Sequence, residues 1–235
     1  MEKKIGILTF HFPDNYGAVL QAYSLYRKIS SMGYDVELID YVPESNAAKK
    51  GLFVRITSIK TFLSNIIRLS AYPLWLKRKN HFKRFRDVFF RMSDRYSGIG
   101  DVPYENYEMI VTGSDQTFNR NYGFTDVYFQ PFNKSNNQKK IAYAPSFGSM
   151  SLSLLHEDDI AKLGDFDSIS CREVDAASAL SSLLNRNVPV VFDPVFLTKK
   201  DEWLQFVDKT YKRNPYVFVY DLNARDNVLK IAREK

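Results

Sequence analysis

The sequence predicts an α/β protein built on a doubly wound, Rossmann-like parallel sheet. Short apolar runs typical of strands alternate with helix-like segments along most of the 235 residues. The first such unit places a helix pattern between two strand-like runs, and strands joined in this way are parallel with a right-handed crossover. A hydrophobic share of 45% is enough for a core that covers both faces of such a sheet.

The elements follow in order. The opening strands are Ile5–Phe10 and Asp35–Tyr41, and the helix pattern between them runs from Ala18 to Met32 and ends at Gly33. A second helix is expected over Glu173–Leu184. The later strands are short apolar runs at Met109–Thr112, Ile141–Ala144, Ser168–Cys171 and Val188–Phe192.

The sequence predicts one domain and the start of another. Residues 1–195 form the N-terminal Rossmann-like domain, which includes a helical, basic excursion over 51–95. Residues 196–214 are expected to be a connector. Residues 215–235 contain one strand-like and one helix-like run, which we interpret as the start of an incomplete second domain of the same kind.

The basic excursion carries the chain's positive charge. The slightly longer stretch Lys49–Arg95 has thirteen Lys or Arg residues and two acids, a charge of +11, whereas the whole chain has +6, which leaves −5 for the rest. Apolar residues from Leu52 to Ile66 recur every three or four positions, which is typical of an amphipathic helix, and cations mixed with aromatics follow. Such a segment could pack on the sheet or on a partner subunit in a homo-oligomer, bind an anionic membrane surface through 52–95, or capture a phosphorylated substrate. Nucleic acid is not an expected partner because no nucleic-acid-binding motif is present.

Several classes of protein are disfavoured by composition and spacing. The single cysteine, Cys171, cannot form an internal disulfide and fits a reducing compartment. The N-terminus does not resemble a signal peptide, and no uncharged stretch is long enough to span a membrane, so we expect a cytoplasmic protein. The three histidines are scattered without metal-ligand spacing, so no metal is expected. The glycine patterns of dinucleotide sites and P-loops are missing as well.

Polar loops follow the predicted strands and read HFPDNYG, GSDQTFN, APSFG, CRE and DP. In a doubly wound sheet, ligands bind beyond the carboxyl ends of the strands, so these loops are expected to form one cleft. The first loop contributes Asp14, Asn15, Tyr16 and Gly17, and the second contributes Ser114, Asp115 and Gln116. The alternative for the first loop is a purely local one, in which Asn15 caps the helix and the loop is only a turn.

Five blocks together resemble the polysaccharide pyruvyl transferase family: NYGAVLQAYSLYRKISSMGYDVELIDY, VTGSDQTFN, IAYAPSFG, SISCRE and FDPVFL. They occur in the family's order over about Ile5 to Trp203. The resemblance implies a glycosyltransferase-B-like fold with two Rossmann-like domains. It also implies transfer of the enolpyruvyl group of phosphoenolpyruvate onto two hydroxyls of a sugar as a cyclic ketal, with release of phosphate. The sugar would belong to a bacterial cell-surface polysaccharide or its lipid-linked precursor. Phosphoenolpyruvate would be the donor substrate, and no other cofactor is implied.

The resemblance also implies roles for particular residues. Arg172 matches an arginine that is implicated in phosphoenolpyruvate binding, and its alternative role is a salt bridge to Glu173 or Asp175. Asp115 is suited to accept a proton from a sugar hydroxyl, and its alternative role is to cap the next turn. We take Arg172 and Asp115 as catalytic candidates. The substrate-binding candidates are Asp14, Asn15, Tyr16, Gly17, Ser114, Gln116, Asn119, Ser146 and Arg172.

Two departures and two rival functions remain. Phe118 occupies a position where the family usually has tryptophan, and the complete second domain expected after Tyr220 is not contained in this sequence. Asp193 is interpreted as mostly structural. The expected general acid would come from the second domain. A nucleotide-sugar-dependent glycosyltransferase shares the architecture, and a non-catalytic sugar-binding remnant is the other alternative.

Overall fold

The computed structural model describes residues 4–44, 52, 55–122, 126–135, 137–148, 152, 155–207, 218–219, 228 and 230. The chain divides into two compact units, Met1–Thr198 and Lys199–Lys235. In the second unit the described elements are α6 and a 3-10 turn, η7. Most of the predicted connector over 196–214 and of the predicted strand and helix over 215–235 lies outside the described residues, so the division into domains stays a prediction.

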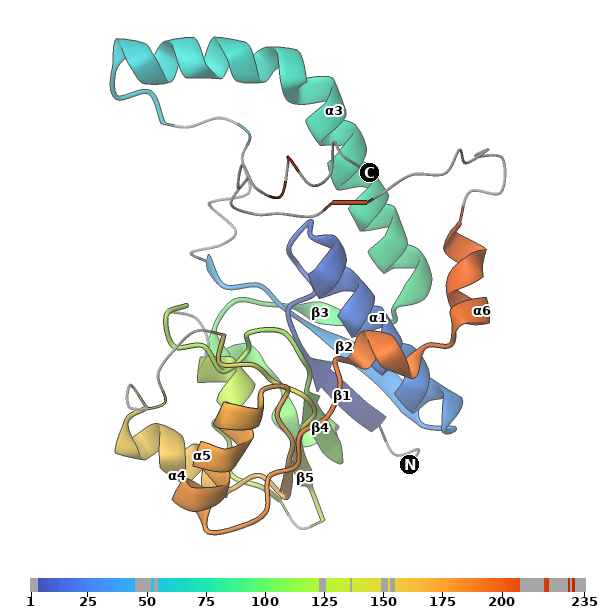
Figure 1. The fold of residues 1–235 in the computed structure, drawn as a ribbon, viewed down its shortest axis with the longest axis vertical. Helices are drawn as coiled ribbons and strands as arrows, with labels where there is room; N and C mark the ends of the chain where they lie inside the picture. Colours follow the sequence, from blue (N-terminus) through green and yellow to red (C-terminus); the bar gives the residue numbers. More distant parts are fainter. Residues whose placement is uncertain are drawn as a thin grey trace. The chain divides into compact units, whose positions relative to one another are not determined.

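The first unit is built on a six-stranded, fully parallel sheet with the order β3-β2-β1-β4-β5-β6 (Figure 1). This is the order of a doubly wound α/β sheet, which confirms the predicted fold class. The strands are β1 (Lys4–Leu8), β2 (Asp35–Tyr41), β3 (Met92–Tyr96), β4 (Met109–Thr112), β5 (Lys139–Ala142) and β6 (Ser168–Ile169). The helices are α1 (Tyr16–Ser31), α3 (Ile59–Phe89), α4 (Glu157–Gly164), α5 (Val174–Leu184) and, in the second unit, α6 (Lys200–Trp203). Single turns of 3-10 helix occur at Ile99–Asp101, Tyr104–Asn106, Asp126–Phe129, Pro194–Leu197 (η6) and Leu204–Phe206 (η7).

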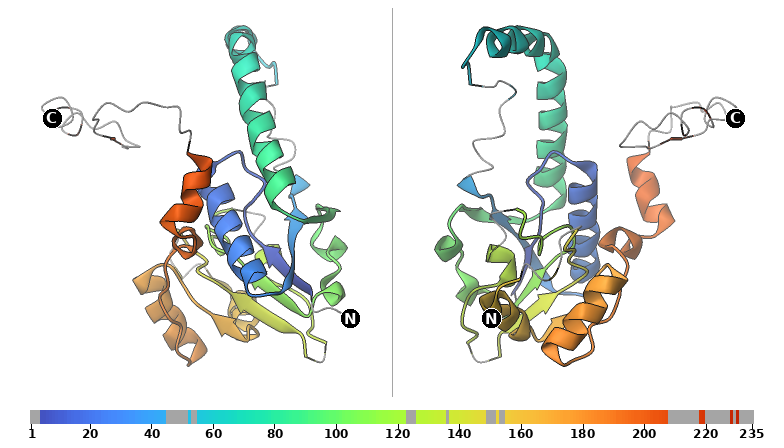
Figure 2. Two further views of the ribbon diagram at one scale, coloured as in Figure 1. Left: turned by 90° about the vertical axis from the view of Figure 1, so that its right-hand side faces the viewer. Right: turned by 60° about the vertical axis from the view of Figure 1, so that its left-hand side comes forward.

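The central strands are covered on both faces, and the two acids that β2 buries there, Glu37 and Asp40, pair with Lys4 and His11. The side chains of β1 and β2 are buried almost without interruption, as expected for strands that are covered on both sides. α1 lies beside β1 and β2, whereas α4 and α5 lie at the β5–β6 end of the sheet (Figures 1 and 2). Two buried clusters result, one around β1, β2 and β4, and one that joins α4 and α5 to β5 and β6. Phe118 belongs to the second cluster, fully buried and stacked on Phe129 with ring centroids 4.8 Å apart.

The structure corrects three details of the predicted elements. The predicted strand Val188–Phe192 is wrong, because Val190 forms only a single bridge with Cys171. The basic segment is helical from Ile59 rather than from Leu52. It does not stay helical to residue 95, since Met92–Tyr96 pairs with β2 as an edge strand of the sheet.

Candidate functional site

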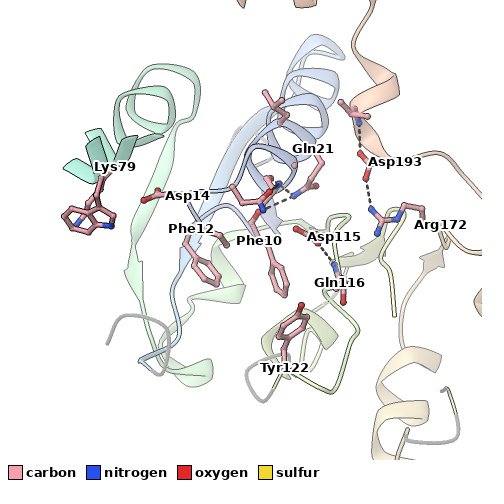
Figure 3. Close-up of a pocket in the computed structure, with 17 residues that line it drawn as sticks. Phe10, Phe12, Asp14, Gln21, Lys79, Asp115, Gln116, Tyr122, Arg172 and Asp193 are labelled. Carbon is pink, nitrogen blue, oxygen red and sulfur yellow. Dashed lines mark hydrogen bonds and ion pairs between the residues drawn. The ribbon is translucent and has the colours of Figure 1, made fainter. Parts of the chain in front are cut away.

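A cavity of about 920 Å³ lies at the carboxyl edge of the sheet, where the chain order changes direction between β1 and β4 (Figure 3). Its lining comes from the loops after β1, β4 and β6, from α1, from α3 and from η6. The lining residues are Phe10, Phe12, Pro13, Asp14, Asn15, Gly17, Ala18, Leu20, Gln21, Trp75, Lys79, Asp115, Gln116, Tyr122, Arg172, Asp193 and Val195. Six of the predicted site residues are therefore brought to one cavity: Asp14, Asn15, Gly17, Asp115, Gln116 and Arg172.

The opening turn is held from both sides. Asn15 caps α1, since its Oδ1 accepts a hydrogen bond from the Ala18 N–H at 3.2 Å. Asp14 is fixed from α3, because Arg86 pairs with its carboxylate at 3.0 Å and Arg78 donates to its carbonyl oxygen at 2.6 Å. The local alternative is thus correct about the cap. Asp14 and Asn15 also line the cavity, where they can contact a ligand in addition to forming the cap and the turn.

The other two residues of the turn differ in position. Gly17 lines the cavity, and a Cβ built there would lie 3.2 Å from Asn15 Oδ1. Tyr16 does not line it: its side chain is exposed, and its ring lies 4.9 Å from that of Phe82 on α3.

A close contact between two loops places Asp115 beside the opening turn. Gly113 allows it, because a Cβ there would lie 2.9 Å from the Cβ of Thr9. Thr9 also donates from its hydroxyl to the Ser114 carbonyl oxygen at 2.9 Å. The loop after β4 is thereby fastened to the loop after β1.

Asp115 itself has an unusual backbone and environment. Its φ of 76° is in the left-handed region, which Asp and Asn tolerate better than most residues. Its Oδ1 accepts the Gln116 N–H at 2.8 Å, and its carbonyl oxygen accepts the Ser146 N–H at 2.9 Å. Burial raises the pKa of Asp115 and the charge of Asp193 raises it further, while the Gln116 hydrogen bond and Arg172 oppose the increase. A carboxyl group with a raised pKa in a cavity is suited to proton transfer.

Arg172 is oriented by two carboxylates. Its Nη1 donates to Asp193 Oδ2 at 2.8 Å, and its Nε lies 3.5 Å from Glu173 Oε1. Asp193 also caps η6 by accepting the Val195 N–H at 3.0 Å, and it lines the cavity as well. The contact with Glu173 is the one that the salt-bridge alternative predicts. The guanidinium nevertheless lines the cavity, about one third exposed (Figure 3).

Three predicted residues lie behind the cavity lining. Ser114, Asn119 and Ser146 are buried and contact residues near the cavity rather than the cavity itself. Their side chains donate to Asp193 Oδ2 at 3.3 Å, to Gln116 Oε1 at 2.7 Å and to Glu173 Oε1 at 2.5 Å, respectively. Their contacts suit the positioning of neighbouring groups.

Gln21 is a cavity residue that sequence reasoning missed. Its side chain is almost fully buried, and its Nε2 donates to Thr9 Oγ1 at 2.8 Å and to the Ala18 carbonyl oxygen at 2.9 Å. Its Oε1 is buried with no hydrogen-bond partner among the described residues. A polar residue one helical turn after Gly17, within an otherwise apolar stretch of α1, was the available signal. Its oxygen is thus an unpaired acceptor buried in the wall of the cavity.

Trp75 and Lys79 of α3 form another part of the lining, and the ammonium of Lys79 lies 4.9 Å from the centre of the Trp75 ring. No local pattern points to these two residues, because they reach the cavity from a helix about sixty positions after the opening turn. Together the lining offers carboxylates, amides, two cations and aromatic rings. Among the described residues, no three His, Cys, Asp or Glu side chains are placed to share a metal ion.

Comparisons with known proteins give one family. The family model described as polysaccharide pyruvyl transferase matches residues 15–232. Neither the curated proteins nor the solved structures contain a match. Because the family model covers most of the chain, including every loop of the cavity beyond Asp14, this protein belongs to the polysaccharide pyruvyl transferase family and is a transferase.

Proposed function

We propose that this protein transfers the enolpyruvyl group of phosphoenolpyruvate to a sugar as a cyclic ketal, with release of phosphate. The observation that carries the proposal is the cavity in which Asp115 and Arg172 meet the opening turn, in a chain of this family. The acceptor is a sugar of a bacterial cell-surface polysaccharide or of its lipid-linked precursor. No cofactor other than the donor substrate is part of the proposal.

The reaction balances without an oxidant or a metal. A proton adds to the methylene carbon of phosphoenolpyruvate and makes its C2 oxocarbenium-like. Two sugar hydroxyls form C–O bonds to C2, and the C2–O bond to phosphate breaks. Of the two protons that the hydroxyls lose, one balances the new methyl group and the other leaves with phosphate. The protein must therefore bind two anionic groups, remove protons from hydroxyls and stabilise developing positive charge.

Asp115 is the proposed base for a sugar hydroxyl. Its raised pKa is closer to neutral pH than that of an exposed aspartate, which favours proton transfer in both directions. Arg172 offers a planar fork of N–H donors that suits a carboxylate or a phosphate. Asp193 and Glu173 hold that fork toward the cavity, where it would bind the donor.

The opening turn is the proposed acceptor subsite. Asp14, Asn15 and Gln116 supply carboxylate and amide groups for sugar hydroxyls, and Gly17 leaves the backbone accessible. Gln21 lies in the wall of the same subsite, with a buried Oε1 that has no partner among the described residues. Phe10, Phe12 and Tyr122 provide the aromatic surface on which the C–H face of a sugar packs.

Location and partners complete the proposal. Among the described residues, no helix combines the length and the apolar character needed to cross a bilayer. We place the enzyme in the cytoplasm, with phosphoenolpyruvate and a glycan as its partners and with no nucleic acid. A second Rossmann-like domain beginning in 215–235 is the proposed source of the general acid.

The test is an assay with phosphoenolpyruvate and a panel of candidate glycans. The expected result is phosphate release that depends on the glycan, together with a new methyl resonance of the ketal in proton NMR. Turnover only with a nucleotide sugar would replace this proposal with a glycosyltransferase. Glycan binding without turnover under either condition would indicate a sugar-binding protein.

A further inference from the structure

The first part of α3 exposes its apolar side rather than burying it. Ile59, Ile67 and Leu74 are 79%, 72% and 73% exposed, and further exposed apolar residues accompany them: Phe62, Leu63, Ile66, Leu69 and Leu76. At 100° per residue, these side chains occupy about half of the helix circumference. In the whole 31-residue helix, the one fully buried side chain is Phe82, near the other end.

The polar side of the same stretch is the covered one. Thr61, Ser64, Asn65 and Arg68 are half-buried, and Arg68 donates to the Leu52 carbonyl oxygen at 2.8 Å. A helix on the surface of a water-soluble domain normally has the opposite arrangement. An exposed apolar area of this kind marks an interaction site.

The second part of α3 fixes the helix to the domain. The rings of Phe85 and Phe89 pack edge-on against Tyr23 of α1 at 5.7 and 5.4 Å, and Arg86 pairs with Asp14. Pro73 lies near the end of the first part, just before Leu74 and Leu76. It removes a helical hydrogen bond, which accounts for the bend of α3 (Figures 1 and 2). The ring contacts and the ion pair anchor the second part of α3 to α1 and to the opening turn.

Cations lie next to the apolar face. From Ile59 to Phe89 the sequence has eight Lys or Arg residues and one acid, Asp87. Lys77 and Arg84 are exposed cations that follow the apolar residues along the helix, beyond Pro73. Apolar side chains followed by a cationic collar match the acyl region and the anionic headgroups of a bilayer.

We infer that the first arm of α3, Ile59–Leu76, binds the surface of an anionic lipid bilayer and inserts its apolar face among the acyl chains. A second copy of this helix is a poorer partner, because pairing two such arms would bring their cations together. Trp75 and Lys79 belong to the same helix and line the cavity, so attachment would hold the cavity close to the bilayer. The inference concerns the helix alone and does not depend on the reaction that the cavity catalyses.

The experiment measures co-sedimentation of the 235-residue protein with phosphatidylcholine vesicles, with and without phosphatidylserine, at low and high salt. The expected result is binding to the phosphatidylserine vesicles at low salt that weakens as salt increases. Leu74→Glu should lower the partition coefficient about tenfold or more, because it replaces an inserted leucine with an anion. Lys77→Gln or Arg84→Gln should lower binding to the anionic vesicles about fivefold each and leave binding to neutral vesicles unchanged.

A matched control separates insertion from a general effect of added charge. Leu183 on α5 is also an exposed leucine, and Leu183→Glu should leave vesicle binding unchanged. Circular dichroism establishes that each variant is folded. Equal binding by wild type, Leu74→Glu and Leu183→Glu would overturn the inference. A vesicle-independent dimer that Leu74→Glu dissociates would overturn it as well, in favour of a second copy.

Discussion

At the scale of single residues, the site combines charged groups whose burial costs free energy with neighbouring groups that hold them in place. Asp115 has a positive φ, which strains the backbone in either protonation state. Its burial makes the ionised carboxylate unfavourable in the folded protein, as its raised pKa reflects. Such unfavourable features concentrate at functional sites because function, rather than stability, requires them. Asp115 should therefore increase the activity of the protein and decrease its stability at neutral pH.

Asp115→Asn tests this expectation. Asn tolerates a positive φ and has nearly the same shape, so the variant should fold. Activity should fall about 10²-fold to 10⁴-fold because the proton acceptor is lost. The folded-state pKa of Asp115 is raised, so its favourable contribution to stability is present below the unfolded pKa and is lost as pH rises through the folded pKa. At neutral pH the variant should thus be at least as stable as wild type.

The measurements are turnover and thermal melting at several pH values. The control is Asp175→Asn, which changes an exposed aspartate at the start of α5 and should alter neither. Unchanged turnover of Asp115→Asn in a folded protein would assign this residue to the turn alone.

A second buried carboxylate shows the opposite behaviour. Burial alone would raise the pKa of Asp40, but the hydrogen bond and charge of His11 and the pairing with Arg95 outweigh it and lower the pKa. The distances are 2.9 Å from Asp40 Oδ1 to His11 Nε2 and 2.9 Å from Asp40 Oδ2 to Arg95 Nε. His11 Nδ1 lies 3.0 Å from the Thr9 carbonyl oxygen, so both ring nitrogens donate when the ring carries two protons.

Asp40→Asn should lower the free energy of unfolding by about 2 kcal/mol near neutral pH, because it removes hydrogen bonds to a charged, buried group. Since the folded-state pKa is lowered, this contribution is present above the unfolded pKa and disappears as pH falls through the folded pKa. Urea denaturation at neutral and acidic pH measures both limits. A stability difference that stays constant down to the lowest pH would contradict the ionised network.

At the scale of elements, the sequence predicts best what is buried on both sides. The bounds of β2 and β4 are those predicted, since β4 is an apolar run and β2 has four apolar residues among its seven, nearly all buried. The edge strand β3 has the sequence MSDRY, which is too polar to be recognised, and its pairing with β2 depends on where α3 returns the chain. Val188–Phe192 has the composition of a strand but only one bridging residue. Trp75 and Lys79 were missed for a related reason, because the bend and docking of α3 are tertiary effects.

The N-terminus of α1 supports a prediction that separates capping from ligand binding. Asn15→Ala removes the hydrogen bond to the Ala18 N–H and should lower the free energy of unfolding by about 1 kcal/mol. Asn15→Ser should restore most of that stability, because serine is also a good cap, but it lacks the amide that faces the cavity. If Asn15 binds the acceptor, Asn15→Ser should still have a raised KM for the glycan. Wild-type KM in the serine variant would mean that this residue only caps the helix.

At the scale of the whole molecule, the parallel sheet gathers residues that are far apart in the sequence. The loops after β1, β4 and β6 leave the same edge, so Asn15, Asp115 and Arg172 line one cavity although more than 150 positions separate the first from the last. This part of the site was predictable from topology alone. Topology did not predict how deeply each residue is buried: Ser114 and Ser146 have no exposed surface and donate to Asp193 and Glu173 instead of lining the cavity.

The most direct test of the central claim is the rate of glycan-dependent phosphate release from phosphoenolpyruvate by wild type, Arg172→Gln and Arg27→Gln. Arg27 is an exposed arginine of α1 and provides the matched control. If the cavity binds phosphoenolpyruvate through the Arg172 fork, Arg172→Gln should lose about 10²-fold or more in kcat/KM, and Arg27→Gln should match wild type. Wild-type kcat/KM in folded Arg172→Gln would contradict the assignment of this cavity as the site of pyruvyl transfer.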